Sequence, residues 1–374
     1  MSSFSIERRK FVKTLAAGAT AGSALGLLNP VRRAFMEELD RIDLENHTAG
    51  SFAQLRAEYM LDPNVTYLNH ASIGTIPHAV FDARSRYLEL CERNPWLYMW
   101  GGEWERPREE VRVKAGEFIG CKASEITFTH NTTEAFSLLA HGLPLGGGDE
   151  VVFSSLNHDG ASVGWFLNSA AKGYRVKRFQ FPVADVPGMT KADVLNIYDE
   201  QISSNTRVLV FPHVDNMIGL RHPVRELAAL ARSRGVEFVA VDSAQTVGML
   251  PVNVREMGVD VFATSPHKWL QAPKGLGLTY VSEKIRHMVR PMWVTWGQTR
   301  NGWTDTGRIF EDYGTRNLAE VLTLGDAIDF QRRLSPSERE AHLHALWQYT
   351  RRRVMEHPRA DWRSSHSREL GGSL

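Results

Sequence analysis

The stretch from position 236 to position 268 places an acid, an amide and an amine after two apolar runs. Asp242 and Gln245 follow the first run, VEFVAV, and Ser265, His267 and Lys268 follow the second, VDVFAT. Open α/β sheets bind their ligands at the carboxyl ends of the strands. We therefore expect these side chains to meet around one bound molecule. A primary amine beside an acid and several donors is the residue set that pyridoxal phosphate (PLP) chemistry needs.

Two of these residues have distinct tasks in that chemistry. The Lys268 amine would hold the PLP aldehyde as a Schiff base and would then move the proton at the α-carbon of the substrate. The Asp242 carboxylate would keep the pyridine nitrogen protonated, so that the ring can accept electrons. At about 3 Å and an effective dielectric constant of about 20, this ion pair contributes roughly 5 kcal/mol before desolvation is subtracted.

Another segment provides a candidate phosphate site. Asn131, Thr132 and Thr133 open the helix-like run TTEAFSLLAHGL directly after the strand-like run EITFTH. The amino terminus of a helix offers free N–H groups and the positive end of the helix dipole, where an anion binds. Ser265 and His267, close to the lysine in sequence, add further donors. The sequence thus predicts phosphate binding between these segments.

Taken singly, these residues have ordinary alternatives, because a lone Asp or Lys at a strand end is usually a surface charge. The ordered set favours a PLP site, and here the sequence resembles the class V aminotransferase family, fold type I PLP enzymes that include cysteine desulfurases, kynureninases and isopenicillin N epimerase. Its YLN and GTRN segments resemble the isopenicillin N epimerase-like branch. The resemblance covers about residues 65 to 330, in YLNHASIGTIP (67–77), ITFTHNTTEA (126–135), SLNHDGASV (155–163), HVDNMIGLRHPVREL (213–227), AVDSAQ (240–245), SPHKW (265–269) and FEDYGTRN (310–317).

The resemblance implies further cofactor contacts. It implies that Gln245 contacts the phenolic oxygen of the ring, that His158 stacks on the ring, and that Asn216 lies near the same oxygen. The flat aromatic face of a histidine suits such stacking. Without the resemblance, a loop histidine bonded to a backbone carbonyl would be the favoured interpretation of His158, and Asn216 could equally be a turn former.

The substrate side is less complete. The resemblance places Asn69 there and gives Thr315 and Arg316 contacts to phosphate or substrate, in the same subunit or in that of a homodimeric partner; a solvated Arg316 is the alternative. After the helical segment 334–357 the sequence departs from the family, whose C-terminal arginine binds the substrate α-carboxylate. Arg363 and Arg368 are candidates by residue type alone. Either other arginines replace the missing one, or a shortened small domain impairs catalysis.

These observations predict a PLP-dependent enzyme that acts on an amino acid or an amino-acid-like substrate. Aminotransferase, epimerase and lyase reactions share the first steps, so the sequence leaves the reaction open. The alternative is an exported PLP-binding protein with impaired or no catalysis. Sulfur transfer is disfavoured because neither Cys91 nor Cys121 matches the nucleophilic cysteine of the desulfurases.

The first thirty residues predict export. SIERRKFVK carries the pair Arg8 and Arg9 and precedes TLAAGATAGSALGLL, an apolar run too short to span a bilayer comfortably. A basic front followed by such a run is typical of a twin-arginine signal, which carries folded, cofactor-loaded proteins out of the cytoplasm. A small-x-small cleavage site at positions 19–21 lies early, so an uncleaved anchor is the open alternative, as is a disordered basic N-terminus.

Composition agrees with a large α/β enzyme. The 374 residues are 43% hydrophobic, the net charge is +1, and the two cysteines form no disulfide framework or metal motif. The near-neutral charge disfavours nucleic acid as a partner. Apolar strand-like runs alternate with helical runs, which predicts an α/β fold with a mostly parallel sheet covered on both faces. The resemblance to fold type I enzymes implies that this sheet is of the seven-stranded type. We expect a signal (1–30), a helical lead-in (31–65), a large PLP domain (66–325) and a partial small domain (326–374).

The aromatic segments 94–104 and 292–303 are expected beside the substrate or the dimer partner, although such residues more often pack in a core or an interface.

Overall fold

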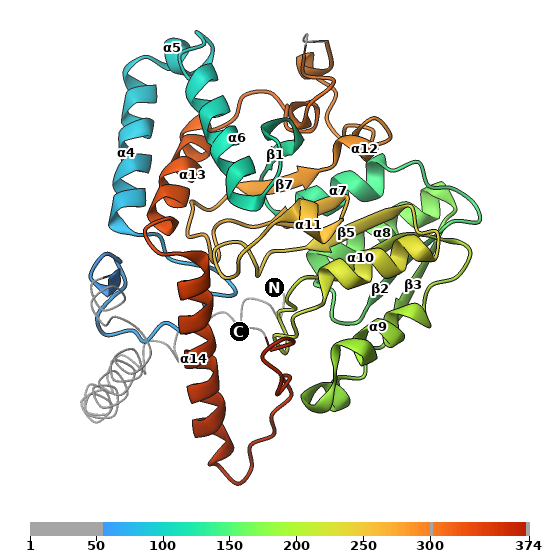
Figure 1. Ribbon diagram of the computed structural model, residues 1–374. Coiled ribbons are helices and arrows are strands. Elements are labelled where there is room, and N and C mark those ends of the chain that lie inside the picture. The colour runs from blue at the N-terminus through green and yellow to red at the C-terminus, as the bar shows by residue number, and fades with distance from the viewer. Residues whose placement is uncertain (1–54, 300–301, 372–374) are drawn as a thin grey trace, which may run out of the picture. The chain divides into compact units, whose positions relative to one another are not determined.

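The computed structural model describes residues 55–299 and 302–371, and Glu58–Leu374 forms one compact unit (Figure 1). The predicted signal and most of the predicted lead-in lie outside the described residues. The helices are α4 (His78–Arg93), α5 (Pro95–Met99), α6 (Glu105–Ile119), α7 (Thr132–Gly142), α8 (Asp159–Lys172), α9 (Lys191–Asp199), α10 (Val224–Ser233), α11 (Val254–Met257), α12 (Glu283–Arg286), α13 (Leu318–Gln331) and α14 (Pro336–Met355). The strands are β1 (Ile126–Thr129), β2 (Glu150–Ser154), β3 (Arg175–Phe179), β4 (Thr206–Pro212), β5 (Phe238–Asp242), β6 (Val261–Thr264) and β7 (Gly277–Val281).

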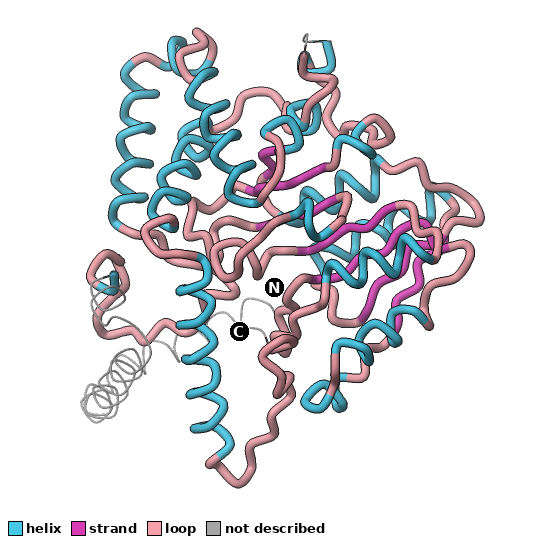
Figure 2. The backbone as a smooth tube through the Cα atoms, viewed as in Figure 1, coloured by secondary structure: helices cyan, strands magenta, loops and turns pink. Residues whose placement is uncertain are grey.

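The strands form one seven-stranded sheet in the order β1-β7-β6-β5-β4-β2-β3, seen as the magenta tubes of Figure 2. β7 is antiparallel to both of its neighbours, β1 and β6, and the other pairs are parallel. All strands except β7 therefore run in the same direction. Their carboxyl ends meet at one edge of the sheet, where ligands of such folds bind.

Alternate residues of each strand face opposite sides of the sheet. On one side Val208, Phe238 and Val261 form a core cluster with Phe136 of α7 and Trp165 of α8. α7 and α8 begin at the carboxyl ends of β1 and β2. Because both helices pack on this face of the sheet, their amino termini are held at its carboxyl edge.

The other side of the sheet is equally apolar. Leu209, Val239 and Phe262 are fully buried there, and α10, which contacts β5, buries Leu227 and Ala231. Figure 1 shows α10 crossing in front of the strands. Burial on both sides explains why these strands read as nearly continuous apolar runs.

A second group of helices lies beside the sheet. α13 packs against α4 and α6, and α14 extends away from this group in Figure 1. Ser335 begins α14 with a capping box to Glu338, and Pro336 occupies the first turn. After α14 the chain returns to the loop behind β4, where Leu220 and Gly371 pair in an isolated bridge. The predicted division into a large and a small domain stays a prediction.

Two sequence-based expectations differ from the structure. Leu55 and Arg56 are helical, but residues 59–65 are turns and extended chain, with Tyr59 bridged to Pro77, so the predicted helix does not reach residue 65. Pro63 and an Asx turn, in which the Asp62 carboxylate accepts from the Asn64 N–H at 2.8 Å, oppose helix there. The sequence analysis also missed β3, an edge strand whose residues RVKRF carry charges on their exposed positions.

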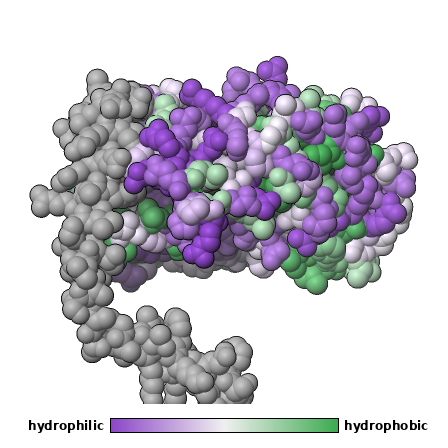
Figure 3. Space-filling model, turned by 90° about the horizontal axis from the view of Figure 1, so that it is seen from below, coloured by the Kyte–Doolittle hydropathy of each residue, from purple (hydrophilic) through white to green (hydrophobic). Residues whose placement is uncertain are grey.

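The surface is mixed in polarity. Figure 3 shows polar residues over most of the face seen from below, with apolar residues gathered in patches toward one edge. No helix within residues 55–299 and 302–371 is long and apolar enough to cross a membrane. Within those same ranges, no three His, Cys, Asp or Glu side chains are grouped so as to hold a metal ion.

Candidate active site

A cavity of about 260 Å³ lies at the carboxyl edge of the sheet. It collects residues that follow β1, β2, β4, β5 and β6, which brings together segments more than 100 positions apart in sequence. Its lining residues are Ser72, Asn131, Thr132, Thr133, His158, Gly160, Pro212, Val214, Asn216, Asp242, Ala244, Gln245, Ser265, His267 and Lys268. Every cofactor-site residue predicted from the sequence is among them.

Lys268 and Asp242 share this cavity; Asp242 is buried and Lys268 is half-buried. Burial lowers the pKa of the Lys268 amine, and the charge of Asp242 opposes that shift. Burial raises the pKa of the Asp242 carboxyl, which the Ala244 N–H, donating to Oδ1 at 3.0 Å, and the charge of Lys268 oppose. Burial thus shifts the amine toward its neutral, nucleophilic form and the carboxyl toward its neutral form, while the charge of each group opposes the shift of the other.

The amino terminus of α7 forms one end of the cavity. Asn131 caps this helix, accepting from the Glu134 N–H at 3.0 Å. The Ser265 hydroxyl accepts from the Thr132 N–H at 3.2 Å and lies 2.9 Å from Thr132 Oγ1. Thr133 is exposed to the cavity. Together these groups place hydroxyls and a helix amino terminus where an anion would bind.

His158 and Asn216 line the cavity from two loops. His158 is the N-cap of α8, and its Nδ1 accepts from the Gly160 N–H at 3.0 Å. This bond assigns the neutral tautomer with its proton on Nε2. Asn216 lies on a turn that Asp215 holds, because the Asp215 carboxylate accepts from the N–H groups of residues 217, 218 and 220 at 2.7 to 2.9 Å.

His267 and Gln245, two further residues of the lining, are held in defined states by their surroundings. Burial, with the charges of Lys268 and Lys274, lowers the pKa of His267 to about 4, so its imidazole is neutral near pH 7. Gln245 is buried, and its amide is bonded to Ala71 and Trp269. Gln245 thus connects the cavity to the loop that contains Ala71, and the next residue of that loop, Ser72, lines the cavity.

The residues predicted for the substrate side lie elsewhere. Asn69 is exposed and does not line the cavity. Thr315 and Arg316 line a second cavity of about 370 Å³. Arg316 Nη1 donates to the Phe128 carbonyl at 3.1 Å, so the arginine is fixed against β1.

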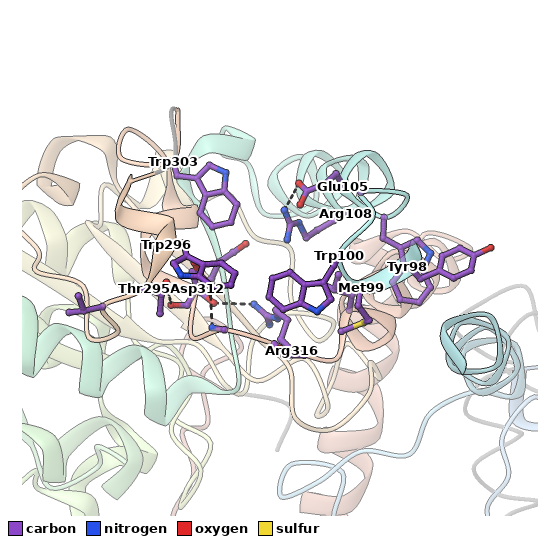
Figure 4. Close-up of a pocket in the computed structure, with 17 residues that line it drawn as sticks. Tyr98, Met99, Trp100, Glu105, Arg108, Thr295, Trp296, Trp303, Asp312 and Arg316 are labelled. Atoms are coloured by element: carbon purple, nitrogen blue, oxygen red, sulfur yellow. Dashed lines mark hydrogen bonds and ion pairs between the residues drawn. The ribbon is translucent and has the colours of Figure 1, made fainter. Parts of the chain in front are cut away.

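The second cavity joins the two aromatic segments that the sequence singled out. Figure 4 shows Trp100 and Trp296 side by side, with Trp303 beyond them, and the ring centroids of Trp100 and Trp296 are 5.5 Å apart. Asp312 and Arg316 lie below these rings in the figure. The expectation that these segments lie beside the substrate or the dimer partner stays a prediction.

The sequence analysis missed some residues of the first cavity. Ser72, Gly160, Pro212, Val214 and Ala244 line it as well. All of these except Pro212 stand inside the quoted family-like segments, which is the signal that could have identified them. Neither Arg363 nor Arg368 lines the cavity. The same is true of Cys91 and Cys121, the two cysteines of the chain.

Comparison with known proteins adds a family to this geometry. The family model for aminotransferase class V matches residues 66–371. Isopenicillin N epimerase of Amycolatopsis lactamdurans is 30% identical over 326 residues, which are 82% of this chain and 79% of that protein. A probable cysteine desulfurase of Methanothermobacter thermautotrophicus is 29% identical over 289 residues, 74% of this chain and 69% of that protein.

Solved structures agree on the fold. The apo structure of cysteine desulfurase from Thermococcus onnurineus NA1 has a TM-score of 0.74 at 24% identity and covers 86% of this chain and 80% of its own. A C-DES mutant with glycine covalently linked to its PLP cofactor also has a TM-score of 0.74, at 22% identity, covering 81% of this chain and 80% of its own. At these identities the structures establish the fold alone.

Proposed function

The chain belongs to the class V aminotransferase family, whose cofactor is pyridoxal phosphate, and from this premise we propose that it is an enzyme acting at the α-carbon of an amino acid or amino-acid-like substrate. One observation carries the proposal. The amine of Lys268 and the carboxyl of Asp242 share a cavity with the amino terminus of α7. Amine, acid and anion site are the three things that PLP needs from a protein.

The residues present fit the cofactor. Lys268 would attach it, Asp242 would face the ring nitrogen, and Thr132, Thr133 and Ser265 would hold the phosphate. Space for a ligand is kept by glycine: a Cβ atom at Gly160 would lie 2.5 Å from Thr133 Oγ1, and one at Gly277 would lie 2.6 Å from the Asn131 nitrogen. Alanine at either position would push into the amino terminus of α7, which the phosphate requires.

The chain's own groups account for the proton chemistry. Bound PLP supplies an electron-withdrawing ring that stabilises negative charge at the substrate α-carbon. Lys268, with its pKa lowered by burial, can accept a proton at that carbon and return it. The negative charge of the Asp242 carboxylate would stabilise the positive charge of the protonated ring nitrogen. Its burial makes that interaction stronger than it would be in water.

The finer reaction rests on two arguments. The relatives include isopenicillin N epimerase and cysteine desulfurases. Sulfur transfer through a protein thiol is disfavoured because both cysteines lie outside the cavity, and burial raises the pKa of Cys121 to about 12. We therefore favour transamination, epimerisation or elimination over desulfuration, with an amino acid or amino-acid-like molecule as the substrate.

Two further proposals rest on the sequence. The paired arginines before the apolar run support export through the twin-arginine route, with the enzyme in the periplasm or held by an uncleaved anchor. A homodimer, in which Thr315 and Arg316 serve the partner subunit's site, would provide the arginine that the lining residues of the first cavity lack.

Borohydride labelling tests the proposal. Purified protein with PLP should show a visible absorbance band that borohydride removes, with PLP fixed covalently to the chain. Lys268→Ala should lose both signals. Lys274→Ala is the matched control, because burial also lowers the pKa of Lys274 but its side chain lies outside the cavity; it should keep both.

A panel of L- and D-amino acids then identifies the substrate class by the change each causes in the band. A protein that takes up no PLP would overturn the proposal. A band that no amino acid perturbs would favour the alternative, a PLP-binding protein without catalysis, and the absence of arginine from the lining of the first cavity would be its cause.

A further inference from the structure

The loop that contains Ala71 and Ser72 lies directly against the turn that carries Lys268. The Gly74 N–H donates to the His267 carbonyl at 2.8 Å. A Cβ atom at Gly74 would lie 2.3 Å from the Lys268 carbonyl oxygen and 2.7 Å from that of His267. Only glycine allows this approach, so the loop, defined here as residues 69–74, and the lysine turn form one unit.

Gln245 joins this loop to Trp269. Its Nε2 donates to the Ala71 carbonyl at 2.9 Å, and its Oε1 accepts from the Trp269 indole N–H at 2.7 Å. An indole N–H can only donate and a carbonyl can only accept. Both partners therefore require the same orientation of the Gln245 amide, with Nε2 toward Ala71 and Oε1 toward Trp269. The hydrogen-bonding capacities of the partners thus assign the two amide atoms, which have similar shapes.

Trp269 is itself held in place. Its ring centroid lies 5.8 Å from that of His70, a residue of the same loop. His70 Nε2 lies 3.3 Å from Gln271 Nε2, and Gln271 has a φ of 60°, in the left-handed region. The Gln271 side-chain carbonyl accepts from Gln331 of α13 at 3.0 Å. Trp269 also packs against the apolar cluster of Val214, Met249 and Leu250. It is therefore held between this cluster and His70 and can direct the amide of Gln245.

We propose that Trp269 is a positioning residue of the cavity: its indole N–H fixes the Gln245 amide, which holds the loop 69–74 and presents Ser72 at the cavity wall. Ser72 is the only residue of this loop that lines the cavity. Gln245 Nε2 keeps a second N–H, and Gln245 lines the same cavity. The functional part of this proposal rests on the proposed function, because it takes the cavity as the PLP and substrate site.

Trp269→Phe is the variant that tests the proposal. It keeps an aromatic ring beside His70 but removes the indole N–H together with one ring of the indole, so Gln245 Oε1 loses its donor and the amide becomes free to rotate away from Ala71. We expect amide hydrogen exchange in a peptide covering residues 67–77 to become about fivefold faster, the size expected for the loss of one hydrogen bond. The dissociation constant for PLP should rise by a similar factor.

The hydrogen bonds from Trp269 to Gln245 and from Gln245 to Ala71 are called the relay here. Two more variants separate the loss of this relay from a general loss of structure. Gln245→Glu keeps the acceptor for Trp269 but replaces the donor to Ala71 by a carboxylate oxygen, and it should release the loop even if Trp269→Phe folds poorly. Trp165→Phe is the control, since the Trp165 indole donates to the Ala161 carbonyl at 3.0 Å inside α8. It should lower stability and leave exchange at residues 67–77 unchanged.

The decisive comparison is a double-mutant cycle. Trp269→Phe should have no further effect on exchange in a Gln245→Leu background, because the relay is already broken. An unchanged exchange rate in Trp269→Phe, or an equal effect in both backgrounds, would overturn the proposal. Since exchange is measured without PLP, a loop that is released in a protein that binds no PLP would refute the proposed function alone.

Discussion

At the scale of single residues, the first cavity is built around two groups that burial drives toward their neutral forms. Burial lowers the pKa of Lys268 and raises that of Asp242, and each group's charge opposes the shift of the other. An isolated buried carboxylate is unfavourable, whereas one opposite a cation is stabilised. This environment explains why an acid at the end of β5 suits a cationic ring nitrogen. Within the protein the charge of Lys268 only partly offsets the burial of the Asp242 carboxylate, and a protonated ring nitrogen would add a second positive charge beside it.

Asp242→Asn tests this argument. The amide keeps the shape of the side chain and can still accept from the Ala244 N–H, but it carries no charge. We expect turnover of the substrate found in the amino-acid panel to fall about 100- to 5,000-fold, which corresponds to the roughly 3–5 kcal/mol lost when one partner of a buried ion pair is removed. Steady-state kinetics with saturating PLP measure the effect.

Asp260→Asn is the matched control for that experiment. Asp260 is also buried, but it lies before β6 and accepts from the Val239 N–H at 2.8 Å, far along the strands from the cavity. Its replacement should lower the thermal midpoint and leave turnover per folded molecule close to that of the wild type. Equal losses of turnover in the two variants would contradict a special role for Asp242.

At the scale of elements, the strands and the residues that follow them could be predicted from the sequence. Apolar runs such as VEFVAVD are buried on both faces, and a polar residue directly after the run lies at the sheet edge. The loop 69–74 could not be placed in this way. Its position depends on contacts with His267 and Gln245, more than 170 residues away, and no local pattern encodes such contacts.

A buried ion pair between elements was also beyond the sequence. Arg112 of α6 donates to both carboxylate oxygens of Glu311, at 2.9 and 2.7 Å, and to the Ile126 carbonyl at 2.9 Å. Glu311 also accepts from the Phe128 N–H at 2.9 Å. The pair therefore joins α6, β1 and the segment before α13. An arginine in a run of charges, ERPREEVRVK, gave no sign of being almost fully buried.

Arg112→Met should destabilise the protein by about 3–5 kcal/mol, because it leaves Glu311 buried without its cation. Arg112 holds the pKa of Glu311 at about 2, below its usual value, so the pair stabilises the fold above about pH 4.5 and loses this contribution as the pH falls toward 2. Urea unfolding at pH 7 measures the loss. The double variant Arg112→Met with Glu311→Leu should lose less than the sum of the two single variants, and strict additivity would contradict the pairing.

At the scale of the whole molecule, one edge of one sheet organises the site. Because only β7 is antiparallel, the segments after β1, β2, β4, β5 and β6 converge there, and helices on both faces keep the sheet dry. The same dry interior encloses titratable groups that take no part in the proposed chemistry. His213 and His222 are buried beyond the end of β4, where the His222 N–H donates to the His213 carbonyl at 2.7 Å.

These two histidines should make the stability of the whole chain depend on pH. Burial lowers the pKa of each to about 3, with the charge of Arg221 adding to the shift of His213. In the unfolded chain a histidine has a pKa of about 6.5. Above that value both states are neutral and the stability is fully present. As the pH falls from 6.5 toward 3, the unfolded chain takes up protons that the folded chain does not, so stability is lost at up to about 1.4 kcal/mol per pH unit for each histidine.

His222→Phe isolates this effect, because His222 is surrounded by the rings of Phe181, Tyr198 and Phe211 and phenylalanine fits such neighbours. Between pH 6.5 and 5, where Glu311 stays ionised, the free energy of urea unfolding should fall less steeply in this variant than in the wild type, while His213 and His267, whose pKa values burial also lowers, keep part of the slope. His78→Gln, at an exposed histidine, should leave the slope unchanged. If the slope in His222→Phe equals that of the wild type, His222 does not contribute to the acid sensitivity, and His213 and His267 are the next residues to replace.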